Sequence, residues 1–271
     1  MLKTDLKSII EAKRPGFFEK QPRVVSAAIL KILEHVVHFK ELQDFFEQYG
    51  DRRNLEFVES VFSYLDVSYQ LDEEDLHKIP PEGPLICVAN HATGPLDGLV
   101  LLKLIGQVRQ DVKIVLTDLL AELEQLRDLF LLYDQYALKL QKKNILAIRK
   151  SLQQEQAVIF FPAGEVTKLS WQGLRESSWM AGPITLAGKY DVPILPVHLQ
   201  ARNSLLYYLS AKVNRHLSTL LLSHEMFAKR SQQIPVTIGD LIPASLLRDE
   251  HFDAAAQAER LKDIVYQLGK N

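Results

Sequence analysis

Apolar residues recur at helical spacing between Val24 and Phe46, with charged residues between them. This pattern predicts one amphipathic helix, because positions three and four apart share a helix face. The charged positions carry both signs, so we expect the apolar face to pack on the protein core rather than on a membrane. Prolines and a glycine between Ile79 and Pro84 would stop any helix there. Residues 1–80 are therefore predicted to form an N-terminal helical extension.

After residue 84 the pattern changes to short, almost wholly apolar runs separated by helical stretches. The runs cover residues 84–89, 112–116, 157–161, 193–199 and 234–238. Strands that alternate with helices predict a mainly parallel sheet, and the lack of polar alternation predicts strands covered on both faces. We therefore expect an α/β fold with a mainly parallel central sheet flanked by helices. Residues 81–271 would form this domain, as a single structural unit with the N-terminal extension.

Composition and charge exclude several classes of protein. The 271 residues are 47% apolar and 24% charged, with a formal net charge of -2, so we expect no basic surface for nucleic acid. No apolar stretch reaches about 18 residues, the length needed to cross a bilayer as a helix. No secretory signal is visible, which favours a cytoplasmic protein. The single cysteine, Cys87, is predicted to be a small buried apolar residue.

In open α/β sheets, binding sites lie beyond the carboxyl ends of the strands. His91 and Asp97 follow the first apolar run, with Gly94 and Pro95 between them. A turn at Gly94 and Pro95 would bring the carboxylate to one imidazole nitrogen and leave the other as a general base. The chain has no Gly-x-Ser-x-Gly motif, so this base would activate a hydroxyl of the substrate. The alternative is that Asp97 only caps the following helix.

Two further strand ends carry candidate binding residues. Phe161, Pro162, Gly164 and Glu165 follow the third run, where Gly164 permits close approach of the backbone. Arg202 follows the fourth run, and its planar guanidinium suits a carboxylate or a phosphate. A surface ion pair is the alternative for Arg202. We expect neither a metal site nor a resident cofactor.

The ordered blocks resemble the glycerolipid and lysophospholipid acyltransferase superfamily. The resemblance is carried by Asn90-His91 with Asp97, by Phe161 to Gly164, and by Val192 to Val197. More narrowly, the chain resembles the hemolysin-like branch, which includes O-acyltransferases that make ornithine and glycine lipids. The further blocks for this branch are Trp179, Arg202 to Ser204, and Ile238-Gly239. The resemblance covers about residues 20 to 245.

The resemblance implies a reaction and a location. An acyl group would pass from a thioester, acyl carrier protein or acyl-CoA, to the hydroxyl of a lysolipid. The protein would associate peripherally with the inner face of the cell membrane. His91 would act as the general base with Asp97 as its partner, and the substrate-binding residues would be Phe161, Pro162, Gly164, Glu165 and Arg202.

Two departures from the commonest superfamily pattern bear on the site. Five residues separate His91 from Asp97, where four are usual, and Ala163 stands where a glutamate is usual. The hemolysin-like branch shares both departures. Whether Glu165 takes over the role of that glutamate stays open.

Other functions remain open from the sequence. The same fold serves a thioester hydrolase or an inactive lipid-binding relative, and product formation with and without an acceptor hydroxyl separates these from a transferase. A module that docks on a membrane enzyme would not depend on His91. The apolar segment 204–222 and the helix at 24–46 are candidates for membrane contact, with ordinary core packing as the alternative.

Overall fold

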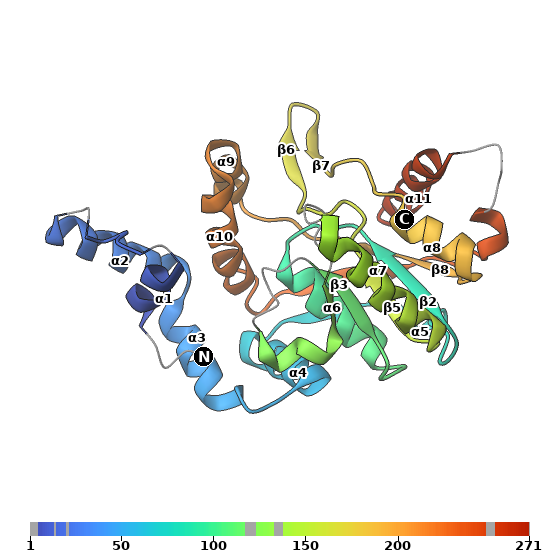
Figure 1. Ribbon diagram of the computed structural model, residues 1–271, viewed down its shortest axis with the longest axis horizontal. Coiled ribbons are helices and arrows are strands. Elements are labelled where there is room, and N and C mark those ends of the chain that lie inside the picture. Colours follow the sequence, from blue (N-terminus) through green and yellow to red (C-terminus); the bar gives the residue numbers. More distant parts are fainter. Residues whose placement is uncertain are drawn as a thin grey trace.

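The computed structural model describes residues 5–13, 15–19, 22–116, 123–132, 138–247 and 253–270. A seven-stranded sheet in the order β1-β9-β8-β2-β5-β3-β4 forms its centre (Figure 1). Its strands are β1 (Ser68–Gln70), β2 (Leu85–Ala89), β3 (Lys113–Leu116), β4 (Phe130–Leu132), β5 (Ala157–Phe160), β8 (Ile194–Leu199) and β9 (Gln233–Ile238). A separate antiparallel hairpin consists of β6 (Lys168–Ser170) and β7 (Gly173–Arg175).

Helices surround the sheet. The described α-helices are α1 (Leu6–Lys13), α2 (Arg23–Val36), α3 (Phe39–Tyr49), α4 (Asn54–Leu65), α5 (Glu73–Leu76), α6 (Pro95–Gly106), α7 (Leu138–Gln153), α8 (Gly182–Tyr190), α9 (Leu205–Val213), α10 (Arg215–Phe227) and α11 (Ala254–Leu268). Short 3-10 helices cover Glu124–Leu129 and Ala244–Leu247. Within the described ranges, no helix has both the length and the apolar character needed to cross a bilayer.

The sheet is mainly parallel, as the alternation of strands and helices predicts. β2 pairs in parallel with β5 on one side and with β8 on the other, and β3 pairs in parallel with β5 and β4. β9 runs antiparallel to β8, and β1 pairs in parallel with β9. The five apolar runs correspond to β2, β3, β5, β8 and β9, which confirms the predicted fold class.

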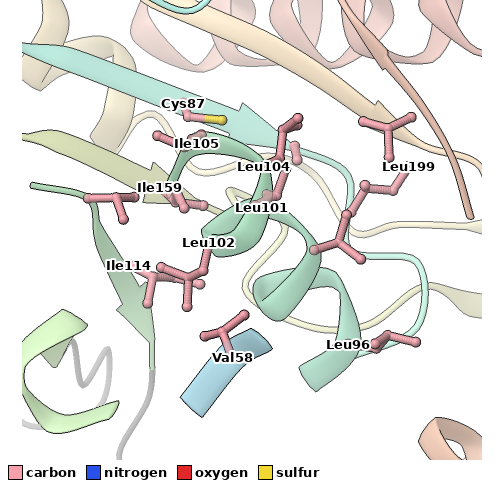
Figure 2. Close-up of a cluster of buried hydrophobic side chains, with 14 of the residues drawn as sticks. Val58, Cys87, Leu96, Leu101, Leu102, Leu104, Ile105, Ile114, Ile159 and Leu199 are labelled. Atoms are coloured by element: carbon pink, nitrogen blue, oxygen red, sulfur yellow. The ribbon is translucent and has the colours of Figure 1, made fainter. Parts of the chain in front are cut away.

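Residues of the central strands alternate between two cores. In β2, Leu85, Cys87 and Ala89 face α4 and α6, whereas Ile86 and Val88 face α7, α8 and α11. All five residues of β2 are fully buried, as expected for a strand covered on both faces. Figure 2 shows the first core, where side chains of α6 lie beside Cys87 of β2 and Ile159 of β5. Cys87 is thus the small buried apolar residue that the sequence predicts.

The predicted helix at 24–46 is two helices, so the prediction of one continuous helix is wrong. His38 adopts a left-handed conformation with φ 54°, which ends α2 and begins α3. The His38 ring bonds Glu41 of α3 and, through Nε2 at 3.1 Å, Nδ1 of His224 in α10. These contacts stabilise a bend that neither proline nor glycine marks in the sequence.

The two halves of this segment are buried differently. No described residue of α2 is buried, and Val24 and Ile32 are largely exposed. In α3, by contrast, Phe39 and Phe45 are buried. The expectation that the apolar face packs on the core is therefore correct for α3. α2 lies at the margin of the molecule (Figure 1) and packs on a buried cluster through Val36 at its end.

Residues before the proline-rich segment contribute to the main core. Phe57, Val58, Phe62 and Leu65 of α4 are buried in the same cluster as the α6 side chains. The strand β1 follows and adds to the edge of the central sheet beside β9. The prediction of a wholly helical N-terminal region is thus wrong at 68–70, because three largely polar residues form a strand there.

Candidate active site

The loop between β2 and α6 carries the first candidate residues. Gly94 precedes the helix with φ 106° and ψ -129°, a conformation open essentially to glycine alone. A Cβ atom at Gly94 would also lie 2.8 Å from Cδ2 of Leu222 in α10. Pro95 then occupies the first helical position, which suits its fixed φ. Glycine and proline thus set a sharp turn that points residue 97 back toward the loop.

Asp97 is the third residue of α6, and its buried carboxylate gathers donors from the loop. Oδ2 accepts the backbone N–H groups of Thr93 at 2.7 Å and of Gly94 at 2.9 Å. Oδ1 accepts the Thr93 hydroxyl at 2.5 Å. Asp97 therefore caps the N-terminus of α6, where a negative charge is also favoured by the helix dipole.

The same carboxylate contacts the imidazole of His91. His91 Nδ1 lies 2.9 Å from Asp97 Oδ2. A carboxylate accepts a hydrogen bond from Nδ1–H, so this contact favours the tautomer in which Nε2 has a free lone pair. The His91 side chain is 19% exposed, whereas that of Asp97 is 2% exposed. Helix capping and contact with His91 are thus combined in Asp97 rather than being alternatives.

The Phe161 ring stacks on the face of the His91 imidazole. The rings of His91 and Phe161 stack with centroids 4.3 Å apart and an interplanar angle of 18°. The chain after β5 then turns, since Gly164 has φ 68° and its N–H donates to the Phe161 carbonyl at 3.0 Å. Pro162 is buried, and its carbonyl accepts the N–H of Met180 at 2.9 Å. The turn therefore lies beside the imidazole.

Both backbone groups of His91 are bonded to the segment that follows this turn. The His91 N–H donates to Oε1 of Glu176. The His91 carbonyl accepts the Thr167 N–H at 2.8 Å and the Thr167 hydroxyl at 3.2 Å. The segment 167–176, which lies far from His91 in the sequence, thereby fixes the backbone that carries the imidazole.

Glu176 is a residue of this site that sequence reasoning missed. Its carboxylate is buried, and Oε2 accepts the indole N–H of Trp179 at 2.8 Å. Burial raises the pKa of Glu176, and the hydrogen bonds from Trp179 and His91 oppose this shift. A glutamate in a segment without helical or strand periodicity is ordinarily exposed. Trp179 is a sign in the sequence that a buried acceptor is required, because its indole N–H needs one.

The residues after β8 join the site through Asn203 rather than Arg202. The Asn203 side chain donates to the Thr93 carbonyl at 3.2 Å. The N–H of Ser204, the N-cap of α9, donates at 2.7 Å to Glu225 of α10, whose side chain is buried. Arg202 is exposed beside them at the same strand end.

Glu165 lies close to the turn but bonds local partners. Its Oε1 accepts the Ser177 hydroxyl and forms an ion pair with Lys168 Nζ at 2.6 Å. The structure therefore groups His91, Asp97 and Phe161 by direct contact, with Pro162 and Gly164 in the adjoining turn. Glu165 and Arg202 lie at the periphery of this group.

An apolar cluster covers the site on the side of α9 and α10. Tyr207, Tyr208 and Leu221 are buried together, and Val166 and Leu222 pack against them. Burial raises the pKa of Tyr207 to about 12, and the negative charges of Glu225 and Asp97 add to the shift. An uncharged, apolar wall thus lies next to the polar loop that carries His91.

The described residues thus place a histidine–aspartate pair at the carboxyl end of a buried strand, where open α/β sheets carry their binding sites. A family model described as acyltransferase matches residues 13–266. The chain belongs to this acyltransferase family, and the protein is an acyltransferase.

Two curated relatives are similar over nearly the whole chain. A lyso-glycine lipid O-acyltransferase from Bacteroides thetaiotaomicron is 28% identical, and the alignment covers 97% of each chain. A lyso-glycine lipid O-acyltransferase from Phocaeicola vulgatus is 25% identical, over 97% of this chain and 94% of the relative. These relatives support the glycine-lipid branch that the sequence blocks resemble.

A solved structure has the same fold. It is that of the 1-acyl-sn-glycerophosphate (LPA) acyltransferase PlsC from Thermotoga maritima, with a TM-score of 0.53. The match covers 89% of this chain and 96% of that chain at 14% sequence identity. At this identity the similarity defines the fold alone.

Proposed function

We propose that this protein transfers a fatty acyl group from an acyl thioester to the hydroxyl of a lysolipid. The observation that carries the proposal is the contact of His91 Nδ1 with the buried Asp97 carboxylate, while the imidazole keeps an exposed edge. The names of the relatives support a lysolipid acceptor. Because the thioester supplies the activated acyl group, no step requires a metal or a resident cofactor.

In the proposed mechanism, His91 Nε2 takes the proton of the acceptor hydroxyl as its oxygen attacks the thioester carbonyl carbon. Asp97 stabilises the imidazolium that forms. When the tetrahedral intermediate collapses, the carbon–sulfur bond breaks and His91 returns the proton to the departing thiolate. The products are the ester of the lipid and the free thiol. Phe161 keeps the imidazole plane oriented by stacking on it.

The remaining predicted residues would bind the substrates. The turn at Pro162 and Gly164 would lie against the reacting carbonyl, and the Gly164 N–H, which donates to the Phe161 carbonyl at 3.0 Å, would have to give up that bond to reach the developing oxyanion. Arg202, exposed at the end of β8, would attract an anionic head group, and Glu165 would bound the polar end of the acceptor. The donor is acyl carrier protein or acyl-CoA, and the protein would meet its acceptor while associated peripherally with the membrane.

The experiment is acyl transfer by the purified protein, with each donor and a panel of lysolipids with glycine, ornithine or phosphate head groups. Mass spectrometry of the lipid and release of the thiol are followed together. We expect product with the wild-type protein and a loss of about 10²–10⁴ in kcat for His91→Gln. His77→Gln, at an exposed histidine directly after α5, is the matched control.

The two readouts separate the alternatives. Thiol release that does not depend on an acceptor hydroxyl would identify a thioester hydrolase. Equal product from the wild-type protein and from His91→Gln would exclude His91 as the general base.

A further inference from the structure

Large apolar side chains are exposed on two neighbouring elements beside the site. Trp171 is fully exposed at the tip of the β6–β7 hairpin, and Leu174 on β7 is also exposed. On α9, Leu205 is 64% exposed and Val213 is 82% exposed. We call the following set the docking surface: Trp171, Leu174, Leu205, Leu206, Leu209 and Val213, all of them exposed.

The two elements lie side by side. α9 contacts β6, and in Figure 1 the hairpin and α9 project on the same side of the molecule. Exposed leucines occur singly on many proteins, but a group that includes a tryptophan and several leucines marks an interaction site. The hairpin and α9 therefore bring their exposed apolar side chains to the same side of the molecule.

The charges of these elements are of one sign. No acidic residue occurs between Asp191 and Glu225, the longest such stretch in the chain, nor between Glu165 and Glu176. Arg175 and Lys212 are exposed in these two stretches. Lys168 pairs directly across the hairpin from Arg175 and forms an ion pair with Glu165 at 2.6 Å. Arg175 and Lys212 therefore supply the positive charge of the surface.

We propose that the docking surface rests on an anionic lipid bilayer, with Trp171 and the α9 leucines at the level of the head groups. Apolar and aromatic side chains with cations and without acidic residues are typical of interfacial binding. Tryptophan in particular favours the boundary between water and lipid.

The docking surface lies close to the loop that carries His91. Its link to catalysis rests on the proposed function. Ser204, the N-cap of α9, directly follows Asn203, which donates to the Thr93 carbonyl in the loop that carries His91. α10 returns to the same loop, where Leu222 lies close to Gly94. A bilayer under the docking surface would therefore present its lipids to the side of the molecule that carries His91.

The test is flotation with phosphatidylcholine vesicles that contain or lack phosphatidylglycerol, at low and at high salt. Trp171→Ser with Leu205→Ser and Leu206→Ser removes exposed apolar groups without opening the core. We expect this triple variant to bind anionic vesicles at least about 10-fold less than the wild-type protein. Leu246→Ser with Ile264→Ser, exposed residues elsewhere, is the control and should bind normally.

The contribution of charge is tested separately. Arg175→Glu with Lys212→Glu should abolish the preference for phosphatidylglycerol, and high salt should weaken wild-type binding in the same way. Lys150→Glu with Lys189→Glu changes the net charge equally at exposed positions outside the surface. Its preference for anionic vesicles should remain.

The outcome for docking is distinguishable from the outcome for catalysis. His91→Gln should bind vesicles as the wild-type protein does, and the triple variant should keep full turnover on a short-chain, water-soluble acceptor. Equal vesicle binding by the triple variant and its control would overturn the proposal, as would absence of wild-type binding. Self-association or binding of acyl carrier protein that is lost in the triple variant, with vesicle binding unchanged, would assign the surface to a protein partner instead.

Discussion

The carboxylate of Glu176 accepts the backbone N–H of His91, so the segment after β7 fixes the strand end that carries the imidazole. Its second oxygen accepts the Trp179 indole, and Lys262 of α11 donates to the Glu176 carbonyl at 3.3 Å. Glu176 does not touch the reacting edge of the imidazole in this arrangement. It is a positioning residue, and its effect on catalysis would act through the backbone of His91.

Glu176→Gln should lower both activity and stability. The single amide oxygen can replace one carboxylate oxygen, which leaves either the His91 N–H or the Trp179 indole N–H without an acceptor. We expect a loss of about 1–3 kcal/mol in the free energy of unfolding and a fall of about 10- to 10²-fold in kcat from the shifted imidazole. Urea unfolding and steady-state kinetics measure these effects, with exposed Glu82→Gln as the control.

The difference in unfolding free energy between the wild-type protein and Glu176→Gln should also depend on pH. The pKa of Glu176 is raised above its ordinary value of 4.5, so the stability it contributes is fully present below pH 4.5 and is lost as the pH rises through the raised pKa. Glutamine does not titrate. The stability difference between the wild-type protein and Glu176→Gln should therefore shrink as the pH rises from 4.5. A constant or growing difference would contradict this assignment.

Asp97→Asn should separate the two roles of Asp97. Asparagine has one acceptor oxygen where aspartate has two. Its NH₂ group must therefore face either the imidazole or the loop donors, and it cannot accept all of the hydrogen bonds that Asp97 accepts. We expect kcat to fall by about 10²–10⁴ through the wrong histidine tautomer. The weakened cap should cost about 1 kcal/mol of stability. His91→Gln should lose activity without this loss of stability, and thermal unfolding of both variants provides the comparison.

Gly94→Ala should reveal the strain in the turn. Alanine at φ 106° costs about 1–3 kcal/mol of stability, and its Cβ would also meet Leu222. In a Leu222→Ala background the contact is relieved, so the two changes together should cost less than the sum of their separate effects. Strictly additive costs in urea unfolding would show that Leu222 does not restrict Gly94.

His198 should make the protein sensitive to acid. It lies on β8 with a buried Nδ1 that has no hydrogen-bond partner in the described residues, and burial lowers its pKa below 6.5. A histidine with a lowered pKa contributes stability that is present above pH 6.5 and is lost as the pH falls through the lowered pKa. His198→Leu should lose less stability than the wild-type protein between pH 7.5 and about 5. Unfolding by urea at both values checks this.

The parts of the fold predicted from the sequence are those with a strong local pattern. β2 is wholly apolar, and a strand covered on both faces has this composition in any context. β1, by contrast, is the polar segment Ser68–Gln70, and only pairing with β9, more than 160 residues later, makes it a strand. The bend at His38 likewise depends on His224 in α10. Such contacts leave no periodic signal.

In the candidate site, too, contacts between residues close in the sequence could be predicted, and contacts between distant segments could not. The turn that brings Asp97 to His91 could be predicted because Gly94 and Pro95 are adjacent in the chain and have fixed backbone preferences. The contact of Glu176 with His91 spans 85 residues. Trp179 indicates that a buried acceptor is needed nearby, but it does not identify Glu176 as that acceptor or His91 as its second partner. Arg202 follows a strand as expected, but its neighbour Asn203 makes the contact with the loop, and a one-residue difference of this kind depends on side-chain direction.

The position of α4 and β1 determines where the chain can be shortened for expression. The segment at Pro80 and Pro81 resembles a domain boundary, yet a chain that starts there would lack Phe57 and Phe62 from the core. It would also leave β9 without its parallel neighbour, and an unpaired strand edge promotes aggregation. A chain that starts at His38 retains α3, α4 and β1 and discards only α1 and α2. A shortened chain should therefore begin ahead of α3.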